Sequence, residues 1–138
     1  MILSFPEIRS LSSFWETPAV TLFIIMNITS AYFFYLLPKW KIPAVSLFLV
    51  TAFPVTYFES MHNLFAVIFF LSCFWAIAKG NRFNWLAIPY FCGAVIMPLS
   101  LFWGEVLCIY IISLYHLLAL RKVIIVEKKF QNREKKPT

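Results

Sequence analysis

The stretch AVTLFIIMNITSAYFFYLL, residues 19–37, decides the fold class, because it runs for 19 residues without a charge. At a rise of about 1.5 Å per residue, a helix of this length covers about 28 Å, close to the roughly 30 Å hydrocarbon core of a bilayer. Pro38 stops the helix, and Lys39 and Lys41 then flank Trp40. Cations beside an aromatic ring are typical of a turn at a membrane surface. The stretch therefore predicts a transmembrane helix that ends at an interface.

Further apolar segments follow this first one, and short polar turns separate them. We expect membrane spans at about residues 19–37, 42–58, 61–78, 85–102 and 106–122. Turns this short force consecutive helices to lie antiparallel and adjacent. The predicted fold is therefore all-α: a polytopic membrane protein with a five-transmembrane-helix antiparallel bundle, which forms a single domain over residues 1–127.

Prolines and glutamates mark the expected irregularities of these spans. Pro54 lies within the second span, and Pro89 and Pro98 lie within the fourth. A proline inside a helix removes a backbone hydrogen bond and bends the helix, so we expect these bends to open a cavity. We expect interruptions at Glu59, between the second and third spans, and at Glu105, between the fourth and fifth.

The two ends of the chain lack the long uncharged runs of the middle. Within residues 1–18, apolar side chains recur every three residues from Phe5 to Phe14, which predicts a short interfacial helix. Residues 128–138 are rich in lysine and predict a frayed, solvated, basic cytoplasmic tail.

The composition indicates that lipid is the main solvent of the chain. Hydrophobic residues make up 62% of it, charged residues 13%, and the mean hydropathy is +0.81, a balance that one small water-soluble core would not bury. The net charge of +6 is compatible with nucleic-acid binding, but the cations lie in turns and in the tail rather than on a folded basic face. We therefore expect membrane lipids as partners and no nucleic acid.

The distribution of charge predicts the orientation of the bundle, because cationic loops stay on the cytoplasmic side. With the N-terminus outside and the C-terminus in the cytoplasm, all 12 lysines and arginines except Arg9 lie inside. We predict a multi-pass protein of a bacterial-type inner membrane in this orientation. The residues expected to contact lipid headgroups at the cytoplasmic face are Lys39, Lys41, Arg121 and Lys122.

The same orientation gathers polar side chains at the outer face, where we predict a cluster of Glu16, Glu59, His62, Asn63 and Glu105. Glu59 and His62 are three residues apart and would be neighbours on a helix. Carboxylates with an imidazole can bind a cation, relay protons, or act as general acid and base. The alternative is that the acids begin helices and contact interfacial water.

Asn27 and His116 are the candidates for a polar path inside the membrane. Asn27 lies near the middle of the first span, where it either bonds a neighbouring helix or lines such a path. His116 lies about 16 Å along the helix from Glu105, too far for the two to share one metal ion. His116 is either the inner end of a path from Glu105 or a histidine that bonds a nearby carbonyl or a headgroup.

The cysteines give no sign of a metal or redox site. Cys73, Cys92 and Cys108 lie in apolar runs, are odd in number and lack paired spacing. We expect them to be small buried packing residues, and we expect neither a metal site nor a cofactor.

No motif specifies one reaction, and three functions remain open. The first is a non-catalytic subunit or binding module of a membrane assembly, either a homo-oligomer or a larger complex, because so small a bundle has little interior. The second is a small ion or proton transporter or channel with an outer Glu/His vestibule. The third is a membrane enzyme that acts on lipid headgroups through the same cluster. We favour the first, which is not an enzyme.

Overall fold

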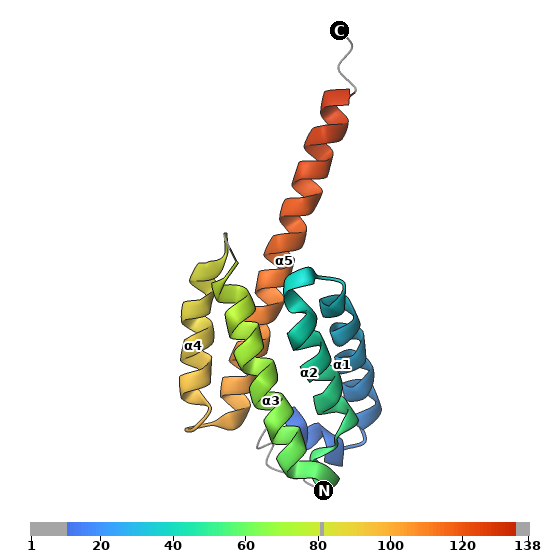
Figure 1. Cartoon of the computed structure of the whole chain (residues 1–138), viewed down its shortest axis with the longest axis vertical. Helices are drawn as coiled ribbons and strands as arrows, with labels where there is room; N and C mark the ends of the chain where they lie inside the picture. The colour runs from blue at the N-terminus through green and yellow to red at the C-terminus, as the bar shows by residue number, and fades with distance from the viewer. Residues whose placement is uncertain (1–10, 81, 135–138) are drawn as a thin grey trace, which may run out of the picture.

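The computed structural model describes residues 11–80 and 82–134, and within these residues the chain forms five α-helices and no strand (Figure 1). The all-α prediction is therefore confirmed. The α-helices are α1 (Val20–Tyr35), α2 (Lys41–Ala52), α3 (Val55–Ala78), α4 (Ala87–Ile96) and α5 (Leu101–Glu134). Three short 3-10 helices accompany them: η1 (Leu11–Glu16), η2 (Pro38–Trp40) and η3 (Asn84–Leu86). Most of the expected N-terminal interfacial helix, residues 1–10, lies outside the described residues.

Consecutive helices run in alternating directions, so the turns gather at two ends of the bundle (Figure 1). α2 packs against both α1 and α3, and α4 packs against α5. The "acidic end" is the end that holds η1, the α2–α3 junction and the α4–α5 turn. The "basic end" is the opposite one, with Lys39 and Lys41 beside η2 and with Lys79 and Arg82 between α3 and α4. α5 continues well past the basic end as a single projecting helix (Figure 1).

The break between the second and third expected spans lies earlier than we predicted. α2 ends at Ala52, Phe53 is extended with φ −110° and ψ 90°, and Pro54 precedes α3. Pro54 thus ends a helix instead of bending one, because its ring disfavours helical geometry in the residue before it. An interruption lies beside Glu59, as predicted, but one residue earlier: Phe58, with φ −135° and ψ 49°, forms a kink, and Glu59 belongs to the part of α3 that follows it.

The junction of the fourth and fifth spans also differs from the prediction. α4 ends at Ile96, and Pro98 lies in the turn that follows rather than in a bent helix. Pro89 lies in the first turn of α4, where proline is tolerated. α5 begins at Leu101, so Glu105 is within α5 and does not separate two spans. At its other end, α5 continues through Glu134, past residue 128, where we expected a frayed tail to begin.

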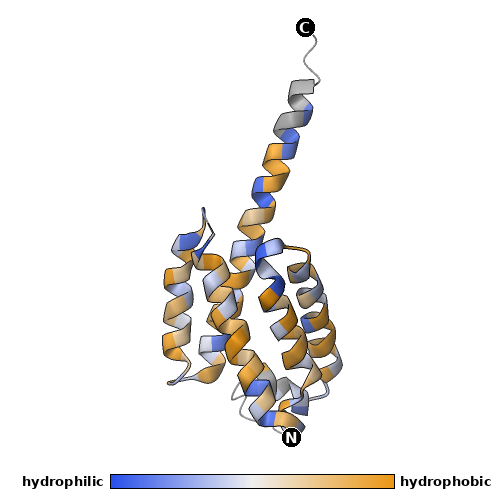
Figure 2. Cartoon of the chain, viewed as in Figure 1, coloured by the Kyte–Doolittle hydropathy of each residue, from blue (hydrophilic) through white to orange (hydrophobic). Residues whose placement is uncertain are grey.

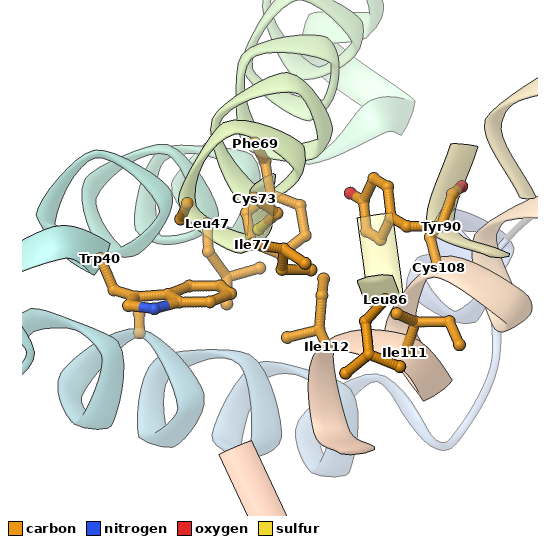
Figure 3. Packing of buried hydrophobic residues seen from close by; sticks show 12 residues of the cluster. Trp40, Leu47, Phe69, Cys73, Ile77, Leu86, Tyr90, Cys108, Ile111 and Ile112 are labelled. Atoms are coloured by element: carbon orange, nitrogen blue, oxygen red, sulfur yellow. The ribbon is translucent and has the colours of Figure 1, made fainter. Parts of the chain in front are cut away.

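The hydrophobic core draws buried side chains from all five α-helices and from η2 and η3, with most of them on α3 and α5 (Figure 3). Cys73 and Cys108 are completely buried there, as predicted, whereas Cys92 is exposed on α4, so its predicted burial is wrong. The hydroxyl of Tyr90 donates a 2.8 Å hydrogen bond to the carbonyl oxygen of Phe70. This bond satisfies the polar end of an otherwise apolar side chain and ties α4 to α3.

α4 and α5 cross closely at two glycines. A Cβ atom at Gly104 would lie 2.8 Å from the carbonyl oxygen of Gly93 and 2.8 Å from the amide nitrogen of Met97. A Cβ atom at Gly93 would lie 2.8 Å from the sulfur of Cys108. Small residues let helix backbones approach in this way, and backbone atoms cannot move aside as the end of a long side chain can.

Two of the helices are long and apolar enough to cross a membrane: α3 and the segment Leu101–Lys128 of α5. Only 28% and 11% of their apolar windows are buried within the chain, which is unlike the core helix of a water-soluble protein. Apolar residues also cover the outer faces of α1, α2 and α4 (Figure 2). This surface makes the chain a candidate for membrane association.

We predict that Gly104→Ala destabilises the bundle. Overpacking costs about 1–3 kcal/mol, against a gain of about 1 kcal/mol for replacing glycine by alanine in a helix. We expect the cost of overpacking to exceed the gain in helix propensity, because the clash involves backbone atoms. The midpoint of unfolding by heat or by SDS should therefore fall. Ala52→Val, at an exposed position of α2, is the control and should leave the midpoint unchanged. An unchanged midpoint for Gly104→Ala would contradict the close crossing.

Candidate functional site

Glu105 is the one member of the predicted outer-face cluster whose carboxylate lies in the interior of the described structure. It is 7% exposed and lies in the second turn of α5. Its Oε2 accepts a 2.6 Å hydrogen bond from the backbone amide of Leu11, the first residue of η1. Glu105 therefore holds η1 against the acidic end of the bundle.

A cavity of about 60 Å³ lies beside Glu105, and its lining comes from η1, α1, α2, α3 and α5. Its polar lining residues are Glu105 and Asn27, and Phe23, Phe69 and Phe70 contribute aromatic rings. A water molecule needs about 10–15 Å³ of such space, so the cavity has room for a few waters or a small polar group. We had predicted Asn27 and Glu105 for separate sites, and the structure brings them to one.

A second hollow, of about 360 Å³, adjoins the first on the side of α1. The two share Leu11, Phe23, Asn27 and Ile109 as lining residues. The outer hollow is also lined by Leu22 and Met26, both of which are exposed on the outer face of α1. It therefore opens sideways, on the apolar flank of the bundle.

The other members of the predicted cluster do not join Glu105. Glu16, Glu59 and Asn63 are exposed. His62 is buried, with its Nδ1 2.8 Å from the carbonyl oxygen of Phe53. A carbonyl only accepts, so Nδ1 carries the proton and donates. Because the carbonyls at the end of a helix lack partners within the helix, His62 caps the C-terminus of α2.

His116 lies at the basic end, inside an aromatic cluster. Its ring stacks on Phe34, with centroids 4.8 Å apart, and meets Trp40 edge-on at 4.3 Å. Its Nδ1 donates a 2.8 Å hydrogen bond to the carbonyl oxygen of Ile112, and its buried Nε2 has no hydrogen-bond partner among the described residues. Trp40, which we expected as an interfacial anchor, is only 3% exposed and belongs to the core.

The cations that we predicted to contact headgroups, Lys39, Lys41, Arg121 and Lys122, are all exposed. The Lys41 ammonium lies 5.9 Å from the centre of the Tyr35 ring, and that of Lys79 lies 4.3 Å from the centre of the Trp75 ring. Lysine beside an aromatic ring at the end of an apolar helix is the arrangement that suits a headgroup layer.

The described residues contain no group of three or more His, Cys, Asp or Glu side chains placed to hold a metal ion. No family model, no curated protein and no solved structure matches this chain.

We predict that Glu105→Ala releases η1 from the bundle. The substitution removes the acceptor of the Leu11 amide, a loss of about 1–3 kcal/mol for a hydrogen bond of this kind. Hydrogen exchange at the Leu11 amide should therefore become faster. Glu105→Gln keeps an acceptor oxygen and should preserve much of the protection, and Glu59→Ala, at an exposed position, should have no effect. Unchanged exchange in Glu105→Ala would contradict this role.

Proposed function

We propose that this chain is a multi-pass membrane protein that acts as a non-catalytic subunit of a membrane assembly. Its N-terminus is outside, its C-terminus is cytoplasmic, and the membrane is a bacterial-type inner membrane. The observation that carries the subunit role is the projecting part of α5, which bears exposed apolar side chains beyond the end of the bundle.

Lipid surroundings are supported by the amount of apolar surface that the fold leaves uncovered. Each of the five α-helices carries exposed large apolar side chains, whether leucine, isoleucine, valine or phenylalanine. Each large apolar side chain left in water forgoes about 1.5–3 kcal/mol of burial. So much exposed apolar surface on a single chain is unfavourable in water. Lipid tails would bury this surface on every side of the bundle.

Two of the proposed crossings are short. α2 has 12 residues and α4 has 10, or about 18 and 15 Å, against a hydrocarbon core of roughly 30 Å. The apolar turn residues Leu36, Leu37 and Leu99, all exposed, lengthen the apolar path at the two ends. We propose that the bilayer thins locally to match the remaining difference.

The proposed orientation rests on the separation of charge between the two ends. Lys39, Lys41, Lys79 and Arg82 belong to the basic end, and α5 projects from the same end with Arg121, Lys122 and Lys128. Loops with lysine and arginine stay in the cytoplasm, so the basic end faces inward.

The projecting part of α5 begins near His116. The contacts of Trp40 with His116 and of Gly80 with the Tyr115 hydroxyl place both turns of the basic end at this level of α5. The 18 residues that follow His116, through Glu134, extend about 27 Å farther. Val123 and Val126, on this part, are 61% and 46% exposed.

These valines continue the face of α5 that packs against the bundle nearer the start of the helix. Ile112, His116, Ala119, Val123 and Val126 are spaced by four, three, four and three residues, which places them on one face of the helix. Ile112 is buried and His116 contacts Trp40, whereas Val123 and Val126, beyond the end of the described bundle, are exposed. A helix of a partner protein that rests on the basic end would complete the face.

The charges beside this face indicate the chemistry of that partner. Arg121, Lys122 and Lys128 outnumber Glu127 on the projecting part, so acidic flanks on the partner helix would be attracted. A second copy of this chain is a less suitable partner, because it would bring the same excess of positive charge to the contact.

A small ion or proton transporter is the second candidate, favoured by the cavity that Glu105 and Asn27 share. His116 is a poor continuation of such a path, because Nδ1 is used by Ile112 and the ring is stacked on Phe34. An enzyme acting on headgroups has less support, because His62 bonds a backbone carbonyl and Glu59 is exposed whereas Glu105 is buried.

The orientation predicts opposite labelling of two engineered cysteines. In a Cys92→Ser background, which removes the exposed native thiol, a membrane-impermeant maleimide applied to intact cells should label Glu59→Cys. It should label Lys122→Cys only after the membrane is opened. Labelling of Lys122→Cys instead of Glu59→Cys in intact cells would overturn the orientation, and labelling of neither variant until the membrane is opened would overturn membrane insertion.

The subunit role predicts that Val123→Ser combined with Val126→Ser reduces the mass of the native assembly, measured after mild detergent extraction. The fold of the bundle should survive, because both side chains lie beyond its end. Ile125→Ser, also exposed but on the other side of the helix, is the matched control and should leave the mass unchanged. An assembly that keeps its mass in the double variant would contradict docking through this face.

A further inference from the structure

Glu105 is a buried carboxylate at the acidic end, and among the residues that the structure describes no basic side chain lies beside it. Of the residues that the structure describes, no lysine or arginine lies at the acidic end, where Glu105 is buried. A buried charge is costly unless an opposite charge and hydrogen bonds offset the loss of water. The Leu11 amide supplies one hydrogen bond and no charge. The cavity next to Glu105 has room for a small cation.

The walls of this cavity suit an organic cation. Asn27 offers an amide oxygen, and Phe23, Phe69 and Phe70 offer aromatic rings. An ammonium group is attracted both by a carboxylate and by the face of an aromatic ring, most strongly where water is excluded. A hydrated metal ion would find only two polar lining residues, so the donor set favours an ammonium over a metal.

The outer hollow suits the apolar body of the same molecule. Sites for drug-sized ligands occupy about 300–1,000 Å³, so the inner cavity of about 60 Å³ holds only a head group, while the adjoining hollow of about 360 Å³ holds a body. Leu22, Met26 and Ile109 make that hollow apolar, and it opens on the flank of α1 that we assign to lipid. A ligand would enter from the bilayer.

We propose that the acidic end binds hydrophobic primary amines in their ammonium form, with the cation at Glu105 and Asn27 and the apolar chain in the outer hollow. This inference goes beyond the subunit role, and it holds whether or not the ligand is carried across the membrane.

The test is calorimetric titration of n-hexylammonium into the full chain in lipid nanodiscs, with protein-free nanodiscs subtracted. Saturable binding is expected for the wild type and for Glu59→Gln, a matched control at an exposed position of the same end. Glu105→Gln, which keeps an oxygen for the Leu11 amide, should bind at least tenfold more weakly. n-Hexanol, which has the same chain and no charge, should show no saturable binding.

Several results would overturn the proposal: no saturable binding to the wild type, equal binding to Glu105→Gln, or equal binding of n-hexanol. Asn27→Leu guards against a folding defect in the first variant, because it leaves the bond between Leu11 and Glu105 intact. Asn27→Leu should also weaken binding. Full binding by a folded Asn27→Leu protein would contradict the proposed role of the Asn27 amide. The labelling of engineered cysteines tests membrane insertion separately, so a failure of binding and a failure of orientation are distinguishable.

Discussion

Proline sets the frame of this bundle, because it cannot donate a backbone hydrogen bond and its ring restricts the residue before it. Pro38 follows α1, Pro54 separates α2 from α3, and Pro98 separates α4 from α5. These positions make α2 and α4 short, and they leave α3 and α5 to run long. The break at Pro54 also frees the carbonyl of Phe53, and the position of His62 follows from that need for a donor.

Several polar side chains within the helices are satisfied locally. The hydroxyls of Ser46, Thr51 and Ser113 donate to carbonyls three or four residues back on their own helices. Such bonds let a polar residue sit in an apolar setting without a partner from another helix. Glu105 is different, because its hydrogen bond reaches η1, 94 residues away in the chain, and its side chain adjoins a cavity. That contrast is why the site is assigned to Glu105 rather than to the more numerous hydroxyls.

The helical class and the gathering of polar turns at two ends follow from features that a sequence displays openly, namely long uncharged runs and clustered cations. The helix ends were harder to predict, because hydropathy does not register that Pro54 and Pro98 interrupt the backbone within apolar runs. The depth of Glu105 depends on how η1, α1, α2 and α3 pack around the start of α5. The sharing of one cavity by Asn27 and Glu105 depends on how α1 rotates against α5, which no spacing along the chain reveals. The capping role of His62 had a signal in advance, because a proline break at residue 54 implies unpaired carbonyls just before it.

The hydrogen bond from Leu11 to Glu105 has a consequence for the biogenesis of the protein. A chain emerges from the ribosome N-terminus first, so η1 is synthesised long before the helix that receives it. Until α5 is in place, the Leu11 amide lacks its acceptor and the cavity lacks one wall. The acidic end therefore closes as the last step of assembly, and a chain truncated before α5 would be left with an open flank.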